Sequence, residues 1–510
     1  MFSPSSLKEG QATQNQKRPV PPPSGGLNYV AALADMSNRY AVVLDNFLAY
    51  PDRVEMRYGA TDHVTGFVSP VKGLWVWNGP TSQKLFATCD DGVFDATAAG
   101  AVGASVATIT DGRTVATTIA TGAGHYLLMA NAVNDLQQYD GTTWSTVAAF
   151  GSLNTNTIYG IETYKQRIFM LQEDTLNLWY LPVNSISGSA TSYPLGAIFR
   201  LGGKLQSIAT WTIDGGAGPD DHLVVVTSNG EVAVFSGTDP SDDTTWSLLG
   251  VYYIARPLGQ LALYKYGGDV LLLTEGGLWA LSTALQTASV DRAGLVSRRI
   301  QPLLAEQALT HGTTHGWQVI HHPNVPMLLI NVPGVSGGQQ LAMHGENKSW
   351  STFSNWPATC WARVGTNLFY GGAATVVHAW TGSADFGANI VATMLGAYST
   401  FGLARDKHVK MMRSTFKSTG SFSYVLGIDN DFANAPSETE IGALVSGAAL
   451  WGTGLWGEAL WGGQTEFRRE WRTVPDVDGV YKAVYCQVAS LSARPSIQAF
   501  EVLYVPGGAF

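Results

Sequence analysis

The sequence predicts an all-β protein: a β-propeller of six or seven blades, a C-terminal β-sandwich-like domain and an extended N-terminal arm. The 510 residues include 57 glycines, 11% aromatic residues and only 14% charged residues. This composition is typical of many short strands joined by tight turns. A unit of two apolar strands also recurs at intervals of roughly 40 to 50 residues, which is the spacing of propeller blades. After residue 382 the recurrence stops.

The first 26 residues are polar and end in the segment PVPPPSGG. Consecutive prolines favour an extended backbone, and the glycines that follow favour flexibility. We therefore expect residues 1–26 to form a flexible arm that becomes ordered only on a partner.

Residues 27–382 hold seven copies of one hairpin-like unit. Each copy has a short apolar strand, a turn rich in Gly, Asn or Asp, and a second short strand. The copies are Lys84–Asp95, His125–Trp144, Arg167–Leu181, His222–Gly237, Asp269–Ser282, Pro326–His344 and Asn367–Trp380. Paired strands at this spacing predict propeller blades, and closure of the circle protects the strand edges. Two stacked β-sandwiches would give a similar spacing and are the alternative fold.

Two inserts interrupt the recurrence of the blades. Residues Ala96–Gly122 are a low-complexity stretch of Ala, Thr, Gly and Val, for which we expect a long β-excursion. Residues Ser289–Ala308 are the best helix candidate, and Pro302 would either start or break that helix. Neither insert carries a catalytic pattern.

Residues 383–510 predict a separate β-sandwich, with strands near Val409–Lys417, Ser421–Asp429, Tyr481–Ala489 and Ile497–Val505. The first of these strands and the residues before it are locally basic. The basic residues are Arg405, Lys407, Lys410, Arg413 and Lys417. They form either a solvated face balanced by acidic residues elsewhere or a docking surface for an acidic partner.

The segment ALWGTGLWGEALWGG, Ala449–Gly463, repeats Leu-Trp-Gly every five residues. On an extended chain this spacing sends Trp451 and Trp461 to one face and Trp456 to the other, which does not suit a single platform for stacking sugars or bases. The glycines allow sharp turns after each tryptophan. We expect the three indoles to be structural anchors that join the C-terminal domain to the propeller or to a neighbouring subunit.

Metal ligands and reactive thiols have little support in the sequence. The histidines His311 and His315 have the spacing of a helical zinc pair, but the residues between them form helix poorly and no Glu follows the first histidine. With His321 and His322, we interpret them as loop and strand-edge residues. The three cysteines lie far apart, which indicates neither a disulfide framework nor a thiolate metal site, and we expect folding in a reducing cytoplasm.

Known catalytic motifs are also lacking. The segments Tyr139–Trp144 (YDGTTW) and Asp242–Trp246 (DDTTW) resemble the tail of a sialidase Asp box, but both lack its full pattern. We interpret each as a turn residue followed by an aromatic residue that wedges between blades. The sequence has no nucleophile elbow in the required context and no nucleotide-binding glycine motif. We expect no catalytic residues and no cofactor, although paired carboxylates for glycoside cleavage leave no signature in sequence spacing.

The formal net charge is −9, so we expect no tight binding of duplex DNA, which requires clustered Lys and Arg. No apolar run reaches the length of a membrane span, and the N-terminus lacks the apolar segment of a signal peptide. We therefore expect neither membrane insertion nor export by that route.

Four stretches carry a resemblance to a known family. Residues Pro21–Gly59 contain Gly-Gly-Leu-Asn at Gly25–Asn28, Leu-Asp-Asn at Leu44–Asn46 and Arg-x-Gly at Arg57–Gly59. The other stretches are Gly124–Trp144, Tyr398–Phe416 and the Leu-Trp-Gly repeat. Together they resemble the tail nozzle proteins of short-tailed bacteriophages, also called tail tubular protein B-like or packaged-DNA stabilisation proteins. The N-terminal arm has no counterpart in this resemblance.

The resemblance implies a virion structural protein without enzymatic activity, made in the cytoplasm of the host bacterium and located in the phage tail. Such a protein is one subunit of a homo-hexameric ring at the distal end of the tail. The ring contacts the tail adaptor protein and fibre or spike proteins, and it forms and gates the channel through which DNA leaves. An acidic chain would let DNA slide without tight binding. The alternative functions are a glycan-binding or a glycan-degrading propeller in host attachment.

Overall fold

A computed structural model describes residues 15–214, 219–285, 294–444, 448–449, 460–461 and 466–507. The chain divides into two compact units. One unit, here called the sandwich unit, contains Met1–Arg57, Glu346–Ser351 and Ala388–Phe510. The other, the propeller unit, contains Tyr58–Gly345 and Thr352–Gly387.

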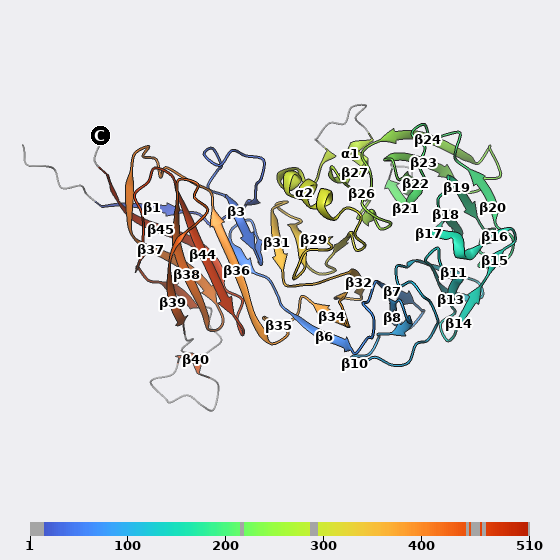
Figure 1. Cartoon of the computed structure of the whole chain (residues 1–510), viewed down its shortest axis with the longest axis horizontal. Helices are drawn as coiled ribbons and strands as arrows, with labels where there is room; N and C mark the ends of the chain where they lie inside the picture. Colours follow the sequence, from blue (N-terminus) through green and yellow to red (C-terminus); the bar gives the residue numbers. More distant parts are fainter. Residues whose placement is uncertain are drawn as a thin grey trace, which may run out of the picture. The chain divides into compact units, whose positions relative to one another are not determined.

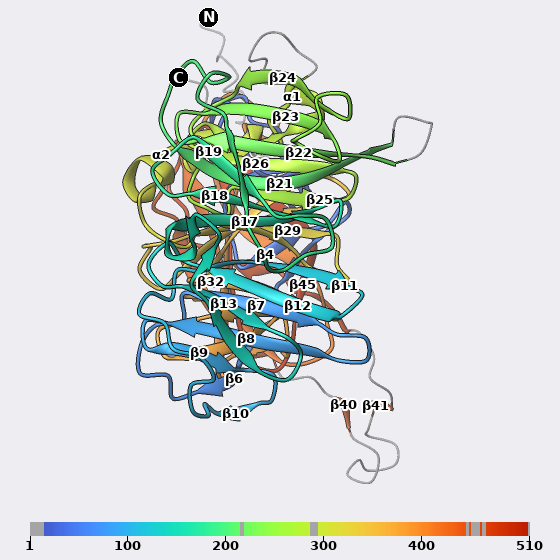
Figure 2. The same ribbon diagram turned by 90° about the vertical axis from the view of Figure 1, so that its right-hand side faces the viewer.

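The described part of the propeller unit contains seven groups of three or four antiparallel strands, which are the blades; the last two groups are parts of one larger sheet (Figure 1). The first four follow one another directly along the chain. They are β7 (Gly73–Asn78), β8 (Gln83–Cys89) and β9 (Gly92–Asp95); β11 (Val115–Thr121), β12 (Gly124–Ala130), β13 (Leu136–Tyr139) and β14 (Trp144–Val147); β17 (Ile158–Tyr164), β18 (Arg167–Gln172), β19 (Asn177–Tyr180) and β20 (Thr191–Pro194); and β21 (Leu205–Asp214), β22 (Pro219–Thr227), β23 (Glu231–Gly237) and β24 (Trp246–Tyr253). Figure 2 shows β21, β22 and β23 running side by side.

The last three blades include one that is built from both ends of the unit. The fifth is β25 (Leu263–Tyr266), β26 (Asp269–Thr274) and β27 (Gly277–Ala280), and the sixth is β28 (Gln318–His321), β29 (Met327–Val332), β30 (Gln339–His344) and β31 (Trp350–Ser354). The seventh is β32 (Cys360–Val364), β33 (Asn367–Gly371) and β34 (Thr375–Ala379), with β6 (Ala60–Thr65) added to β34. All seven predicted hairpins are therefore confirmed as parts of blades.

The seven blades close into a ring. The first strand of each blade contacts the first strand of the next, and β32 of the last blade contacts β7 of the first. The strand β6, which begins the unit, pairs antiparallel with β34, which lies near its end, so that Val64 is opposite Val376. This closure confirms the β-propeller and excludes the two stacked sandwiches.

Aromatic side chains fill the spaces between blades. The ring centroid of Trp144 in the second blade lies 4.9 Å from that of Phe86 in the first. Trp246 in the fourth blade stacks on Phe169 of the third, with centroids 5.9 Å apart, and on Phe235 of its own blade at 5.4 Å. The prediction that the two Asp-box-like segments end in wedging tryptophans is confirmed.

The helix α2 (Gln301–His311) begins with Pro302 in its first turn, where a missing N–H costs nothing. It follows the short 3-10 helix Arg298–Ile300 and buries Leu304 and Ala308. The predicted helix Ser289–Ala308 is therefore confirmed only from Gln301 onward, with Pro302 in its first turn, and residues 289–293 lie outside the described residues. A one-turn helix, α1 (Leu281–Ala284), lies before it. Among the described residues, no helix is long and apolar enough to cross a membrane.

The low-complexity insert contributes two strands to the propeller unit. β10 (Gly100–Ala101) pairs in parallel with β6, and β11 begins the second blade. Short connections complete the unit: β15 (Ala149–Phe150) with β16 (Leu153–Asn154), the 3-10 helix Thr155–Thr157, and β35 (Ala384–Asp385).

The described residues of the sandwich unit form two large sheets (Figure 1). The first contains β1 (Gln16–Val20), β4 (Phe47–Ala49), β5 (Val54–Met56), β37 (Lys407–Ser418), β42 (Glu466–Arg469), β43 (Arg472–Thr473) and β45 (Ser496–Pro506). The second contains β2 (Gly26–Leu27), β3 (Tyr40–Asp45), β36 (Ala388–Gly396), β38 (Phe422–Asn430), β39 (Ser437–Leu444) and β44 (Lys482–Ser490). The ring centroid of Phe416 in the first sheet lies 5.1 Å from that of Phe422 and 4.9 Å from that of Tyr424 in the second. The two sheets therefore share one core. The four predicted C-terminal strands are confirmed.

The division of the chain differs from the predicted boundaries after residues 26 and 382. Residues 27–57 belong to the sandwich unit, because β3 pairs with β36 and β5 pairs with β45. The arm differs as well. Gln16–Val20 forms β1, an antiparallel strand on β45 of the same chain, so this part of the arm is ordered without a second protein. Residues 1–14 lie outside the described residues.

Replacing Trp246 with alanine removes a buried wedge between the third and fourth blades. We expect Trp246→Ala to lower the free energy of unfolding by about 3 to 5 kcal/mol, as for other buried tryptophans. Trp246→Phe keeps the stacking and should cost clearly less. Tyr253→Ala is the control, because Tyr253 is the last residue of the same strand and is 54% exposed. This change should alter the free energy of unfolding by less than about 0.5 kcal/mol. Equal losses for Trp246→Ala and Tyr253→Ala in chemical denaturation would contradict the wedge.

Candidate functional site

The propeller unit contains a central cavity of about 690 Å³ with a largely polar wall. The loop before β11 supplies Asp111 and Arg113, β17 supplies Tyr159, and residues of α2 line the same cavity. The guanidinium Nε of Arg113 lies 3.0 Å from each carboxylate oxygen of Asp111. Burial opposes the charge of Asp111, but the hydrogen bonds from Arg113 outweigh it and hold the pKa of Asp111 below its usual value.

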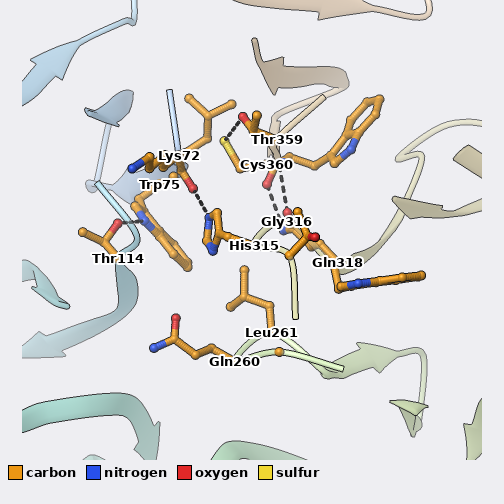
Figure 3. A pocket seen from close by; sticks show the side chains of 16 residues that line it. Lys72, Trp75, Thr114, Gln260, Leu261, His315, Gly316, Gln318, Thr359 and Cys360 are labelled. Carbon is orange, nitrogen blue, oxygen red and sulfur yellow. Dashed lines mark hydrogen bonds between the residues drawn. The ribbon is translucent and has the colours of Figure 1, made fainter. Parts of the chain in front are cut away.

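A smaller space of about 40 Å³ continues this cavity toward β7 and β32 (Figure 3). His315 donates from Nε2 to the carbonyl oxygen of Lys72 at 2.8 Å, and burial lowers its pKa. Trp75 donates from Nε1 to Thr114 Oγ1 at 2.7 Å. Gln318 donates from Nε2 to the carbonyl oxygen of Trp361 at 3.0 Å. The space is large enough for water but not for a larger ligand.

A third space of about 230 Å³ lies along the inner strands. Tyr159 also lines the cavity of about 690 Å³, and Trp75 also lines the space of about 40 Å³. Glu162 of β17 faces this space near Lys265 of β25. Burial raises the pKa of Glu162 to about 7, although the charge of Lys265 opposes the shift.

The four histidines singled out in the sequence have different surroundings. His311 ends α2, and His315 lies in the turn that follows. His321, the last residue of β28, has its Nδ1 2.6 Å from the Tyr264 hydroxyl. His322 Nδ1 accepts two backbone N–H groups at 3.2 Å, and burial lowers its pKa to about 4. The prediction of loop and strand-edge positions is confirmed for His315, His321 and His322, but it is wrong for His311, which is the last residue of α2. Within the described ranges, no group of three or more His, Cys, Asp or Glu side chains is placed to hold a metal ion.

The three cysteines are free thiols inside the two units. Burial raises the pKa of Cys89 and of Cys360 to about 12, and it raises the pKa of Cys486 further. The reactive form of cysteine is the thiolate, so these positions do not suit a nucleophile.

The basic residues of β37 and the loop before it do not form one surface. Lys407 is completely buried and its Nζ donates to the carbonyl oxygen of Val480, so it does not belong to a docking surface. Alternate side chains of a strand face the core, and Lys407 is on that face. Arg413 pairs with Glu501, which also binds Lys17 Nζ at 2.7 Å. The exposed members of the set are Arg405, Lys410 and Lys417.

The tryptophan repeat falls mostly outside the described residues. Trp451 and Trp456 lie outside them, and so does the side chain of Trp461. The backbone of Trp461 belongs to β41 (Leu460–Trp461), which pairs in parallel with β40 (Ala448–Ala449). The role of the three indoles as anchors stays a prediction.

Two glycines of the family-like stretch Pro21–Gly59 stand where a larger residue would clash. Gly26 has a φ of +74°, and a Cβ atom there would lie 2.4 Å from the carbonyl oxygen of Trp350. A Cβ atom on Gly59 would lie 1.9 Å from the carbonyl oxygen of Ala384. These glycines therefore permit close approach of two backbone segments.

Asn46 and Arg57 of the same stretch form a buried hydrogen-bonded contact with Val391, here called the joint. Asn46 has a φ of 57° and turns the chain from β3 into β4. Its Oδ1 accepts from Nε of Arg57 at 2.7 Å, and its Nδ2 donates to the carbonyl oxygen of Val391 at 2.8 Å. Asn46 and Arg57 are both 0% exposed. Both residues belong to the motifs that carry the family resemblance, but the sequence does not predict the hydrogen bond between them.

No family model matches the sequence, and no curated protein matches it. Several solved structures are similar in fold. BBS1N, solved in complex with ARL6DN, has 11% identity and a TM-score of 0.40, over 63% of this chain and 96% of that chain. Raptor of Chaetomium thermophilum has 9% identity and a TM-score of 0.41, over 63% and 29%. The Cps50 (Swd1) β-propeller domain of Myceliophteria thermophila has 13% identity and a TM-score of 0.38, over 63% and 98%. Likeness at this level says nothing about function.

Replacing Asn46 with alanine leaves the buried Arg57 Nε without this acceptor and places alanine in a left-handed conformation. We expect Asn46→Ala to lower the free energy of unfolding of the sandwich unit by about 3 kcal/mol. Asn434→Ala is the matched control, because Asn434 has a φ of 51° but is exposed. It should cost only the conformational part, about 1 kcal/mol. If denaturant titrations give equal losses for the two variants, the joint does not stabilise the unit.

Proposed function

We propose that the chain is a structural subunit of the tail nozzle of a short-tailed bacteriophage, in a ring of six copies around the DNA exit channel. One observation carries the proposal: four residues of the first stretch of the family resemblance fix close contacts inside the fold. Asn46 and Arg57 bind each other in the interior, and Gly26 and Gly59 allow close backbone contacts. Such residues maintain the shape of the fold, which is what a structural building block requires.

The His, Cys and Asp side chains that could act in catalysis have structural roles instead. His315 is hydrogen-bonded to the carbonyl oxygen of Lys72, His322 holds a turn, and the cysteine thiols are buried. The Asp residues of the Asp-box-like segments also hold turns: Asp140 Oδ1 accepts the backbone N–H groups of Thr142 at 2.8 Å and Thr143 at 2.7 Å. These contacts support a structural role rather than an enzymatic one.

The negative net charge of the chain is compatible with the wall of a DNA channel. The net charge is −9, and Lys407 and Arg413 of the basic strand are occupied by partners within the chain. Few clustered cations are left to bind phosphates, so DNA would pass without being held.

Glycan binding in host attachment is the second candidate, and the central cavity of the propeller unit favours it. The cavity of about 690 Å³ is the size of a small-molecule site and combines Tyr159 with the charged side chains of Glu173 and Arg256. Aromatic and charged groups of this kind can bind a sugar.

Immunogold labelling of intact virions tests the first proposal. An antibody against the chain should label only the distal end of the tail, and virions assembled with Asn46→Ala should carry less label than virions assembled with the control Asn434→Ala. Label on the capsid, or virions without label, would contradict the nozzle. Binding of host polysaccharide by the purified chain that is lost in Tyr159→Ala would instead support the second candidate.

A further inference from the structure

A cluster of charged and polar side chains is enclosed at one end of the second sheet of the sandwich unit. Lys482 is the first residue of β44, and its register partner across the sheet is Asn430, the last residue of β38. Asp476 comes from the segment before β44. The side chains of Lys482 and Asp476 are both 0% exposed.

The amine of Lys482 lies against the amide group of Asn430. The distance from Lys482 Nζ to Asn430 Oδ1 is 2.5 Å. A carbonyl bond is about 1.2 Å long, so the Cγ atom of Asn430 lies no more than about 3.7 Å from this Nζ. Reacting atoms that are held at close to 3.5 Å gain a large effective concentration. Nucleophile and carbonyl carbon are therefore already near a reactive arrangement.

Asp476 is placed to move the protons that such a reaction requires. Both of its carboxylate oxygens lie 2.9 Å from Lys482 Nζ. The backbone N–H of Val409 donates to Oδ2 at 2.6 Å and fixes the orientation of the carboxylate. Oδ1 faces the amine and can accept its proton, as a general base does.

A second lysine is enclosed near Lys482. Lys407 is also 0% exposed, and burial together with the charge of Lys482 lowers the pKa of Lys407. Two ammonium groups enclosed together disfavour each other, and enclosing an ion pair is itself costly. A reaction that turns Lys482 and Asp476 into neutral groups removes both costs.

We propose that Lys482 and Asn430 form an intramolecular isopeptide bond, which covalently joins β44 to β38. Asp476 takes one proton from the Lys482 ammonium, and the neutral Nζ attacks Cγ of Asn430. The Nζ–Cγ bond forms, and the Cγ–Nδ2 bond breaks. A second Nζ proton passes through Asp476 to Nδ2, which leaves as ammonia. The products are a secondary amide, one ammonia molecule and protonated Asp476, and the reaction needs no oxidant or other reactant.

The bond would link two central strands of the second sheet. β44 lies between β36 and β38, so separation of β44 from β38 would require breaking a covalent bond as well as the backbone hydrogen bonds. This inference does not rest on the nozzle proposal, because it concerns only the chemistry of three side chains in one unit.

The mass of the full-length purified chain tests the proposal. Under denaturing conditions, the intact mass should be lower than the sequence mass by one ammonia molecule. A protease digest should contain a branched peptide in which Lys482 is joined to Asn430. The variants Lys482→Arg and Asp476→Asn should each have their full sequence mass. Asn434→Ala, which changes a nearby exposed asparagine, should keep the loss.

Three results would overturn the proposal. The first is a wild-type chain with its full sequence mass, a result that does not depend on whether any variant folds. The second is the loss of one water molecule with a branch at Asp476, which would assign the bond to the carboxylate. The third is an ammonia loss that persists in Lys482→Arg, since cyclisation of Asn430 onto its own backbone would give the same mass without Lys482.

Discussion

The antiparallel pairing of β3 with β36 places Asp45 opposite Thr393 and so closes a loop that contains the whole propeller unit. The chain leaves the sandwich unit after this pairing begins and returns to complete the same sheet. Asn46, directly after β3, accepts a hydrogen bond from Arg57 and donates one to Val391 of β36. The joint thus connects the last residues before the propeller unit to the first strand after it. The loss of conformational entropy on closing a loop rises only slowly with loop length, so a few buried contacts can offset the closure of this long loop.

In the propeller unit, too, a strand from the beginning of the unit pairs with a strand near its end. β6, from its beginning, completes the blade formed by β32, β33 and β34 near its end. Both units therefore pair early strands with late strands, which protects edges that would otherwise be open to other chains. For a proposed subunit of a DNA exit channel, such closure would resist fraying at the chain ends. Interdigitated aromatic residues such as Trp144 and Trp246 add stability between blades.

Local patterns predicted much of this fold. The seven hairpins, the helix with Pro302 in its first turn and the four C-terminal strands all depend on neighbours close in sequence. Pairings between distant segments could not be predicted. Residues 27–57 have the same short apolar strands as the blades, and only their pairing with β36 and β45 assigns them to the sandwich unit. Burial of Lys407 depends on which face of β37 meets the core, and the contact of Asp476 with Lys482 depends on how the segment before β44 packs against the sheet.

A pair of engineered cysteines tests the return of the chain to one sheet most directly. Register partners in an antiparallel sheet have Cα atoms about 4.5 to 5.5 Å apart, which is within the range of a disulfide. Asp45→Cys with Thr393→Cys should form a disulfide on oxidation, while the natural cysteines stay reduced because they are buried. Asp45→Cys with Ala392→Cys, one residue out of register, should form little. A disulfide in the second variant but not in the first would contradict the pairing, and with it the division of the chain on which this account depends.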